Sequence, residues 1–221
     1  MKINDIFPRE LEKENKILRV VELAKSFYDK NDSAHDFDHA LRVTTIGVRI
    51  ARQEGADIEL IVLAGILHDT ARYDQRMTGI CHAQRGAEIA TDILEKLDYS
   101  EEKIKKVQEM IRTHRFRGGS KPETLEAKVL FDADKLDAIG AVGIARAYTI
   151  CGAQNQKIYN DTPDRPEEDS DEYSPLHEYR YKLSEIIDTM LTTTGKELAE
   201  DRSRFMARYF EQLTGEIRGK F

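Results

Sequence analysis

The sequence has no tryptophan, only two cysteines and only five prolines among its 221 residues. Cys81 and Cys151 lie far apart, without further cysteines to complete a zinc knuckle, so we expect two reduced thiols and no disulfide. Apolar stretches long enough to cross a bilayer are lacking, and the first ten residues include Asp5, Arg9 and Glu10 instead of the apolar core of a signal peptide. We therefore predict a cytoplasmic protein with no membrane partner.

Positive charge is scarcer than negative charge. The 34 Lys and Arg residues stand against 41 Asp and Glu, which gives a formal net charge of -7. Extended nucleic acids are bound largely by neutralising many phosphates with Lys and Arg, so this balance argues against such a partner. Small phosphorylated ligands remain compatible with it. Hydrophobic residues at 40% and charged residues at 34% are typical of a globular protein with its own core.

The spacing of apolar residues predicts an all-α fold. Strand-like alternation is rare, whereas apolar residues recur at intervals of three and four. We expect one domain over 1–221, with a catalytic core at about 17–152, a loop at 153–175 and C-terminal helices at 176–218. Helices are predicted at 11–28, from a cap at Asp36 or Asp38 to Gly55, from Asp57 to His68, at 83–97, at 101–114, from 124 onward, and again around 183–190 and 206–213.

Two segments are predicted to be irregular. Residues 70–81 are polar and show no periodic apolar face, so we expect a loop there. Residues 155–175 contain three prolines and many carboxylates, which predicts a long acidic surface loop, with a partly mobile lid as the alternative.

Four polar residues occupy positions where the helical pattern calls for core side chains. His39 lies seven residues before Ile46 on the same helix face. His68 and Asp69 each follow small or apolar residues four and seven positions earlier, and Asp134 follows apolar residues three, four and seven positions earlier. We expect all four side chains to point into the core.

The two buried carboxylates favour a bound cation close to these four residues. An unpaired buried charge costs several kcal/mol, so two acids near the core require a metal ion or strong hydrogen-bond donors. Two imidazoles and two carboxylates suit Mn, Fe, Co, Ni or Zn, and Mg less well. Taken singly, each residue has a plainer explanation: a histidine such as His114 on an apolar face is more often a hydrogen-bonded core residue, and a buried Asp is more often a helix cap or an ion-pair partner.

The sequence strings around these residues carry a family resemblance. They read 35-HDFDH-39, then 67-LHD-69, then 131-FDADKLDAIG-140, accompanied by 82-HA-83 and 86-GAEIA-90. This pattern resembles the HD superfamily of metal-dependent phosphohydrolases, in particular its small stand-alone bacterial hydrolases. The similarity continues through 194–199 and 204–206, so it covers most of the chain.

The resemblance implies a helical bundle in which His39, His68, Asp69 and Asp134 bind one divalent metal, with manganese the first choice. It also implies hydrolysis of a phosphate ester or anhydride in a small phosphorylated substrate such as a nucleotide, in one group a nucleotide pyrophosphohydrolase. Our hypothesis is that metal-activated water attacks phosphorus while Asp74 or Asp69 handles its proton.

Five further residues are candidates for contacting the substrate or its leaving group, because negative charge builds up there during phosphoryl transfer. They are Arg72, which we class with the catalytic residues, and His82, His114, Arg115 and Lys135. For the three cations, ordinary surface solvation is an equal alternative. For His82 and His114, a second metal site is another, as in two-metal phosphodiesterases of the superfamily.

Other functions remain open from the sequence. The chain could be a catalytically silent nucleotide-binding regulatory module, or an oxygenase that uses iron. A homodimer also remains open. Tyr73, Tyr148 and Tyr159 could stack on a nucleotide base, although packing is the commoner role of a tyrosine.

Overall fold

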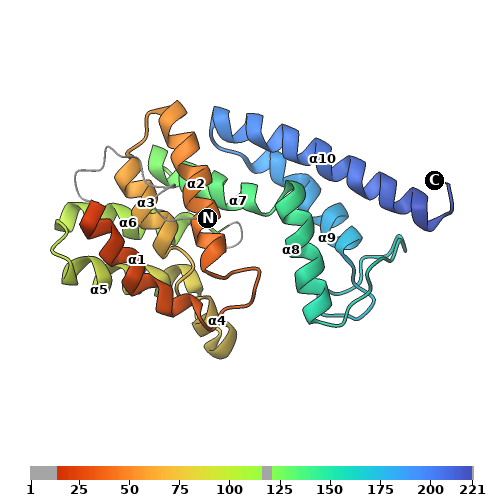
Figure 1. Cartoon of the computed structure of the whole chain (residues 1–221), viewed down its shortest axis with the longest axis horizontal. Coiled ribbons are helices and arrows are strands. Elements are labelled where there is room, and N and C mark those ends of the chain that lie inside the picture. Colours follow the sequence, from red (N-terminus) through yellow and green to blue (C-terminus); the bar gives the residue numbers. More distant parts are fainter. Residues whose placement is uncertain (1–13, 116–120, 221) are drawn as a thin grey trace. The chain divides into compact units, whose positions relative to one another are not determined.

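The computed structural model describes residues 14–115 and 121–220, and in that part of the chain every regular element is a helix (Figure 1). The all-α prediction is confirmed. The chain forms two compact units, one ending at Asp134 and the other beginning at Lys135. The boundary falls inside α7 (Leu125–Asp137), so a helix passes from one unit into the next.

The first unit is built around its most apolar helix. Before α7 it contains α1 (Glu14–Tyr28), α2 (Phe37–Glu54), α3 (Ile58–Leu67), α4 (Arg72–Thr78), α5 (His82–Lys96) and α6 (Glu101–Thr113). Helix α3 packs against α1, α2, α5 and α6, and all its residues from Leu60 to Leu67 are buried. A helix that is apolar all round belongs at the centre of a core. Residues that directly follow α3 therefore emerge in the protein interior.

The predicted helix caps around α2 and α3 are confirmed. The Asp36 side chain accepts a hydrogen bond from the backbone N–H of His39 and starts α2, as expected of an N-cap. Gly55 ends α2 in the left-handed conformation, with φ of 78°. The Asp57 side chain then accepts from two backbone N–H groups of α3. These local signals fix where both helices begin.

The prediction of a loop over 70–81 is wrong, because Arg72–Thr78 forms α4, which ends at a left-handed Gly79. No residue of α4 is buried, so the sequence contains no apolar stripe that could reveal the helix. The helix is instead tied down by polar contacts, among them a hydrogen bond from Arg76 Nη2 to the carbonyl oxygen of Lys30 at 3.2 Å. The predicted helices at 83–97, 101–114 and from 124 agree with α5, α6 and α7 to within one residue at each predicted end.

The second unit contains the end of α7, then α8 (Gly140–Ala153), α9 (Pro175–Tyr181), the 3-10 helix η2 (Leu183–Thr189) and α10 (Thr193–Ile217). The predicted C-terminal helices are present, although 183–189 adopts the tighter 3-10 form.

Residues 154–174 form the predicted long irregular segment, whose two halves are hydrogen-bonded to each other. Gln156 Nε2 donates to the carbonyl oxygens of Glu168 and Ser170 at 2.8 and 3.0 Å. Asn160 Nδ2 donates to the carbonyl oxygen of Glu172 at 2.8 Å. A role as a lid stays a prediction.

Cys81 and Cys151 are both free thiols in the structure. Among the described residues, no single helix is both long and apolar enough to cross a membrane; α7 and α8, bent against each other, meet the length and composition criteria only as a pair. Residues 1–13, which include the segment used to argue against a signal peptide, lie outside the described residues.

Close packing between α2 and α3 depends on a glycine. A Cβ added to Gly65 would lie 2.5 Å from Thr44 Oγ1 and 3.1 Å from Thr44 Cα, and the second of these atoms belongs to backbone that cannot rotate away. We expect Gly65→Ala to lower the free energy of unfolding by about 1–3 kcal/mol through overpacking, although alanine is the better helix former. Urea denaturation measures this change.

The matched control is Gly152→Ala on α8, where an added Cβ meets no atom within 4 Å. This variant should be as stable as the wild type or slightly more stable. Equal urea midpoints for Gly65→Ala and the wild type would show that α2 and α3 are not packed this closely.

Candidate metal centre

The structure brings together the four residues that the sequence singled out as ligands. His39 lies in the first turn of α2, His68 and Asp69 directly follow α3, and Asp134 lies on α7 within the first unit. All four are buried, three of them completely. Nε2 of His39 is 3.5 Å from Asp134 Oδ1 and 3.6 Å from Asp69 Oδ2. His68 Nε2 lies 3.3 Å from His39 Nε2.

A second group of potential ligands adjoins the first and shares Asp69 with it. His82 is the first residue of α5 and His114 follows the last residue of α6, and both are buried. Their Nε2 atoms lie 3.4 and 3.6 Å from Asp69 Oδ1, and 3.2 Å from each other. Asp69 therefore presents Oδ2 to His39 and His68 and Oδ1 to His82 and His114. The ligand atoms of His39, His68 and Asp134 lie within 4.8 Å of one another, as do those of Asp69, His82 and His114.

Hydrogen bonds fix the orientation of three of the imidazole rings. In His68, His82 and His114, Nδ1 lies 2.5–2.8 Å from an oxygen that can only accept a hydrogen bond. The oxygens are the backbone carbonyls of Gly65 and Ile111, for His68 and His114, and the side-chain Oε1 of Gln75, for His82. Nδ1 therefore carries the proton, and Nε2 of a neutral ring presents its lone pair to the other potential ligands.

This arrangement fits a bound cation. Lone pairs of His82 and His114 face each other at 3.2 Å, and such a contact is repulsive unless a positive charge lies close to both. Asp69 Oδ1 is buried, and no hydrogen-bond donor among the described residues satisfies it. Buried polar atoms are normally paired, so an oxygen without a donor in a ring of imidazoles indicates a missing positive partner. Nitrogen and carboxylate donors in this mixture suit a divalent transition metal.

The charges of the site favour ligands that are ready to bind. Burial alone would raise the pKa of Asp69, but Arg72, whose Nε donates to Asp69 Oδ2 at 2.9 Å, holds that pKa well below its usual value. Burial lowers the pKa of His68 to about 4, an effect that Asp69 only partly offsets. Burial likewise lowers the pKa of His82. At neutral pH the carboxylate is therefore ionised and both imidazoles are neutral.

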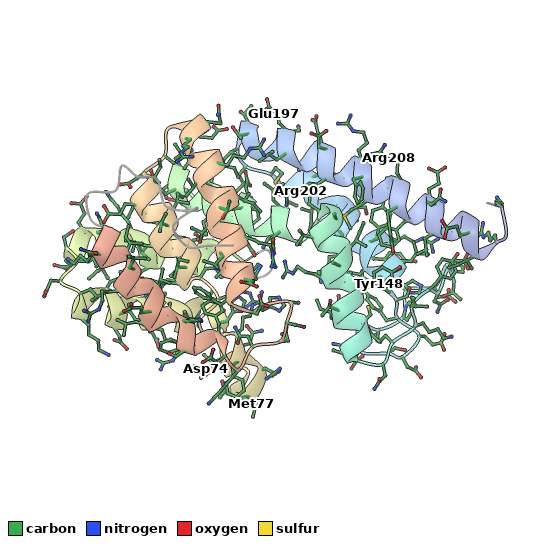
Figure 2. The ribbon with its side chains drawn as sticks, viewed as in Figure 1. Asp74, Met77, Tyr148, Glu197, Arg202 and Arg208 are labelled. Atoms are coloured by element: carbon green, nitrogen blue, oxygen red, sulfur yellow. The ribbon has the colours of Figure 1, made fainter. Side chains whose placement is uncertain are left out.

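Four of the predicted site residues are not among the six potential ligands: Arg72, which donates to Asp69, and the three residues Asp74, Arg115 and Lys135. Asp74 lies on α4 (Figure 2), where its carboxylate is 3.7 Å from Arg85 Nε. Arg115 directly follows His114 in the chain and donates from Nη1 to the sulfur of Cys81 at 3.1 Å. Lys135 is the first residue of the second unit. The roles proposed for Asp74, Arg115 and Lys135 stay predictions.

Sequence reasoning missed Gln75, which accepts hydrogen bonds from the backbone N–H of His82 at 3.1 Å and from its Nδ1 at 2.5 Å. A polar residue on an unrecognised helix gives no signal of such a role. His82 and His114 were grouped in the sequence analysis only through the family resemblance, as one alternative; they are 32 positions apart and meet through the packing of α5 on α6.

Comparison with known proteins assigns the family. A family model described as the HD domain matches residues 36–139. The uncharacterized protein YpgQ of Bacillus subtilis (strain 168) is 32% identical over 202 residues, which cover 88% of this chain and 90% of that protein. The chain belongs to the HD domain family. The resemblance seen in the sequence is thereby confirmed. The range matched by the HD model contains all six residues of the cluster, from His39 to Asp134.

Solved structures of HD proteins agree with this assignment. Bacillus subtilis YpgQ in complex with ADP aligns with a TM-score of 0.71 and 29% identity, over 91% of this chain and 95% of that chain. An HD-superfamily hydrolase from Bacillus thuringiensis aligns with a TM-score of 0.73 and 31% identity, over 92% and 97% of the two chains. HD domains bind divalent metals, and the cluster described above contains two groups of His and Asp side chains that could hold a metal ion.

Metal binding should be measurable through stability. A ligand that binds only the folded chain stabilises it by about 2.7 kcal/mol at a free concentration of about one hundred times Kd. We expect Mn²⁺ added to chelator-treated protein to raise the Tm, and Asp69→Ala to abolish most of this rise because both groups of ligands lose their shared carboxylate. Differential scanning calorimetry with and without Mn²⁺ provides the measurement.

His177→Ala serves as the control, since His177 is a buried histidine of the second unit. Its own Tm can fall, but the increase caused by Mn²⁺ should be retained. A full Mn²⁺-dependent increase in Asp69→Ala would show that the cluster is not the metal site.

Proposed function

We propose that this HD-family chain hydrolyses a phosphate ester or anhydride bond of a nucleotide, with a divalent metal held by His39, His68, Asp69 and Asp134. The observation that carries the proposal is the convergence of buried imidazole nitrogens and carboxylate oxygens around Asp69, whose Oδ1 has no hydrogen-bond donor among the described residues. A purely structural cluster would be expected to pair these atoms with hydrogen-bond donors. Manganese is the ion we expect, and Mg, Co, Fe, Ni and Zn are the alternatives to be compared.

A bound divalent ion supplies positive charge that polarises a phosphoryl oxygen and increases the acidity of water. The protein's own contribution begins with Arg72, whose side chain is 30% exposed and whose Nε is bonded to Asp69 Oδ2. Only one N–H donor is used in that contact, so the rest of the guanidinium is suited to a phosphoryl oxygen. Arg72 also keeps Asp69 ionised, and its rigid position favours orientation of the substrate.

The proton of the attacking water needs an acceptor. Asp69 is a weak base because its pKa lies well below the usual range, so its role in the proposal is to bind the metal and orient Arg72. Asp74 is therefore the acceptor we propose, and it would have to exchange its contact with Arg85 for one with water when substrate binds.

Nucleotides are the proposed substrate class for two reasons. YpgQ, to which this chain is similar over most of its length, has been crystallised with ADP. The net charge of -7 also disfavours an extended nucleic acid as the partner, whereas a small nucleotide needs only a few local cations.

A two-metal phosphodiesterase is a second candidate, favoured by the group formed by Asp69, His82 and His114. A two-metal site would need two adjoining groups of ligands, and Asp69 directs its two oxygens to different groups of imidazoles. Under this alternative, His82 and His114 hold a second ion and do not contact the substrate directly.

Product analysis tests the proposed hydrolysis. We expect the Mn²⁺-loaded protein to release phosphate or pyrophosphate from at least one member of a panel of nucleoside mono-, di- and triphosphates. Chromatography and ³¹P NMR identify the products. Asp69→Ala should lower kcat by a factor of about 10³ or more, and Asp74→Asn by about 10² as expected for loss of a general base. His177→Ala is the control that should keep its activity. Binding of nucleotides without any turnover would instead identify a silent regulatory module.

Metal content separates the one-metal and two-metal alternatives. If two ions bind, His82→Ala should lose about half of the metal measured by inductively coupled plasma mass spectrometry, and the wild type should cleave phosphodiesters. If one ion binds, His82→Ala should keep the metal content of the wild type, while His68→Ala loses it.

A further inference from the structure

The side chain of Gln75 reaches from α4 to the first residue of α5 and contacts a potential metal ligand there. Its Oε1 accepts a hydrogen bond from the backbone N–H of His82 at 3.1 Å and lies 2.5 Å from the ring Nδ1 of the same residue. The side chain of Cys81, the N-cap residue of α5, makes no capping hydrogen bond, so Gln75 also satisfies a backbone donor that the start of a helix leaves unpaired. One amide oxygen thus holds both the backbone and the imidazole of His82.

The backbone N–H of His82 decides the orientation of the amide and the tautomer of the ring. An amide group can be turned over, which exchanges its oxygen for its nitrogen, but a backbone N–H can only donate. The atom of Gln75 that faces this N–H is therefore the oxygen. Because the same oxygen faces Nδ1, the neutral ring carries its proton on Nδ1 and its lone pair on Nε2, which lies 3.4 Å from Asp69 Oδ1.

Without Gln75, His82 would be able to satisfy Asp69 by itself. A neutral imidazole carries its proton on either nitrogen, and in the other tautomer the Nε2–H group would donate towards Asp69 Oδ1. This oxygen is buried and has no donor among the described residues, so such a bond would remove its need for a cation. Gln75 opposes this tautomer, because an unprotonated Nδ1 would face the amide oxygen lone pair against lone pair. The contact therefore keeps Oδ1 available to a positive ligand.

His82 differs from His68 and His114 in the source of its acceptor. The Nδ1 atoms of His68 and His114 lie against carbonyl oxygens of the helices that these residues follow, so helix formation itself supplies the acceptors. The acceptor for His82 comes from α4, which buries no residue and lies against α1 and α5 (Figure 1). Elements with few buried apolar contacts open at a low cost in free energy. The orientation of His82 thus depends on a helix that can detach.

We propose that Gln75 is a positioning residue that makes His82 a metal ligand, so that the group formed by Asp69, His82 and His114 binds a divalent cation while α4 is in place. When α4 detaches, His82 turns its proton to Asp69 and the group loses its ion. The proposal rests on the two-metal form of the function proposed above. It adds a dependence of the second ion on α4, the helix that also supplies Arg72 to the other oxygen of Asp69.

Two substitutions of Gln75 test the proposal against a matched control. Gln75→Leu removes the acceptor, Gln75→Glu keeps one, and Gln53→Leu makes the same change at an exposed position of α2. The first measurement is ¹⁵N NMR of the His82 ring in chelator-treated protein, which requires neither metal nor turnover. We expect the proton on Nδ1 in the wild type, in Gln75→Glu and in Gln53→Leu, and on Nε2 in Gln75→Leu.

The second measurement is calorimetric titration of Mn²⁺ into the same four proteins. We expect the wild type and Gln53→Leu to bind two ions. Gln75→Leu should weaken the binding of one ion by a factor of about 10–100, the usual effect of removing the partner of a metal-bound histidine, and leave the other unchanged. Gln75→Glu should restore the affinity, because a carboxylate acceptor increases the basicity of the ligand nitrogen.

The proposal is overturned if Gln75→Leu keeps the proton on Nδ1, if it leaves both Mn²⁺ affinities unchanged or weakens both equally, or if the wild type binds fewer than two ions. With one ion still bound, each of these results leaves the one-metal hydrolase function standing. A proton position and a second ion that both depend on Gln75, in a protein that cleaves no nucleotide, would support the positioning role and refute the hydrolase function.

Discussion

The buried carboxylate of Asp69 is the group on which the arrangement of the site depends. An ion in this position costs several kcal/mol unless it is paired and hydrogen-bonded, and Arg72 supplies one partner on Oδ2. Oδ1 lies 3.4 Å from Nε2 of His82 and 3.6 Å from Nε2 of His114, and has no hydrogen-bond donor among the described residues. The fold tolerates this because Asp69 follows α3, whose apolar surface is covered on all sides by the other helices of the first unit. The polar side chains of the site are thus held in place by an apolar core.

Two of the imidazoles are oriented by the same local device. His68 and His114 each directly follow the last residue of a helix and donate Nδ1–H to the carbonyl oxygen three residues earlier. Carbonyl groups in the last turn of a helix have no partner within the helix, so the histidine satisfies one of them while its Nε2 is turned to the interior. His82 obtains the same orientation from Gln75, a residue of α4. Helix ends therefore provide both rigidity and direction.

The features readable from the sequence were those encoded locally. Asp36 and Asp57 marked the starts of α2 and α3 through their capping side chains, and Gly55 marked the end of α2 through its left-handed backbone. The helical spacing predicted that His39, His68, Asp69 and Asp134 point into the core, and all four are buried. Helix α4 was not predicted from the sequence, because it buries no residue and therefore shows no apolar periodicity. The second group of ligands, which the sequence offered only through the family resemblance, depends on how α5 packs against α6, and the contact of Gln75 with His82 depends on where α4 lies. Such tertiary relations leave no pattern in a single sequence.

The cap of α2 sets a limit on how this protein can vary. Asp36 fixes the start of the helix through the backbone N–H of His39, so the number of residues between them determines where the imidazole faces. Each residue added to a helix turns the following side chains by about 100°, and a single insertion between Asp36 and His39 would swing the ring out of the interior. Changes of residue type in this short stretch are therefore easier to accommodate than changes in its length.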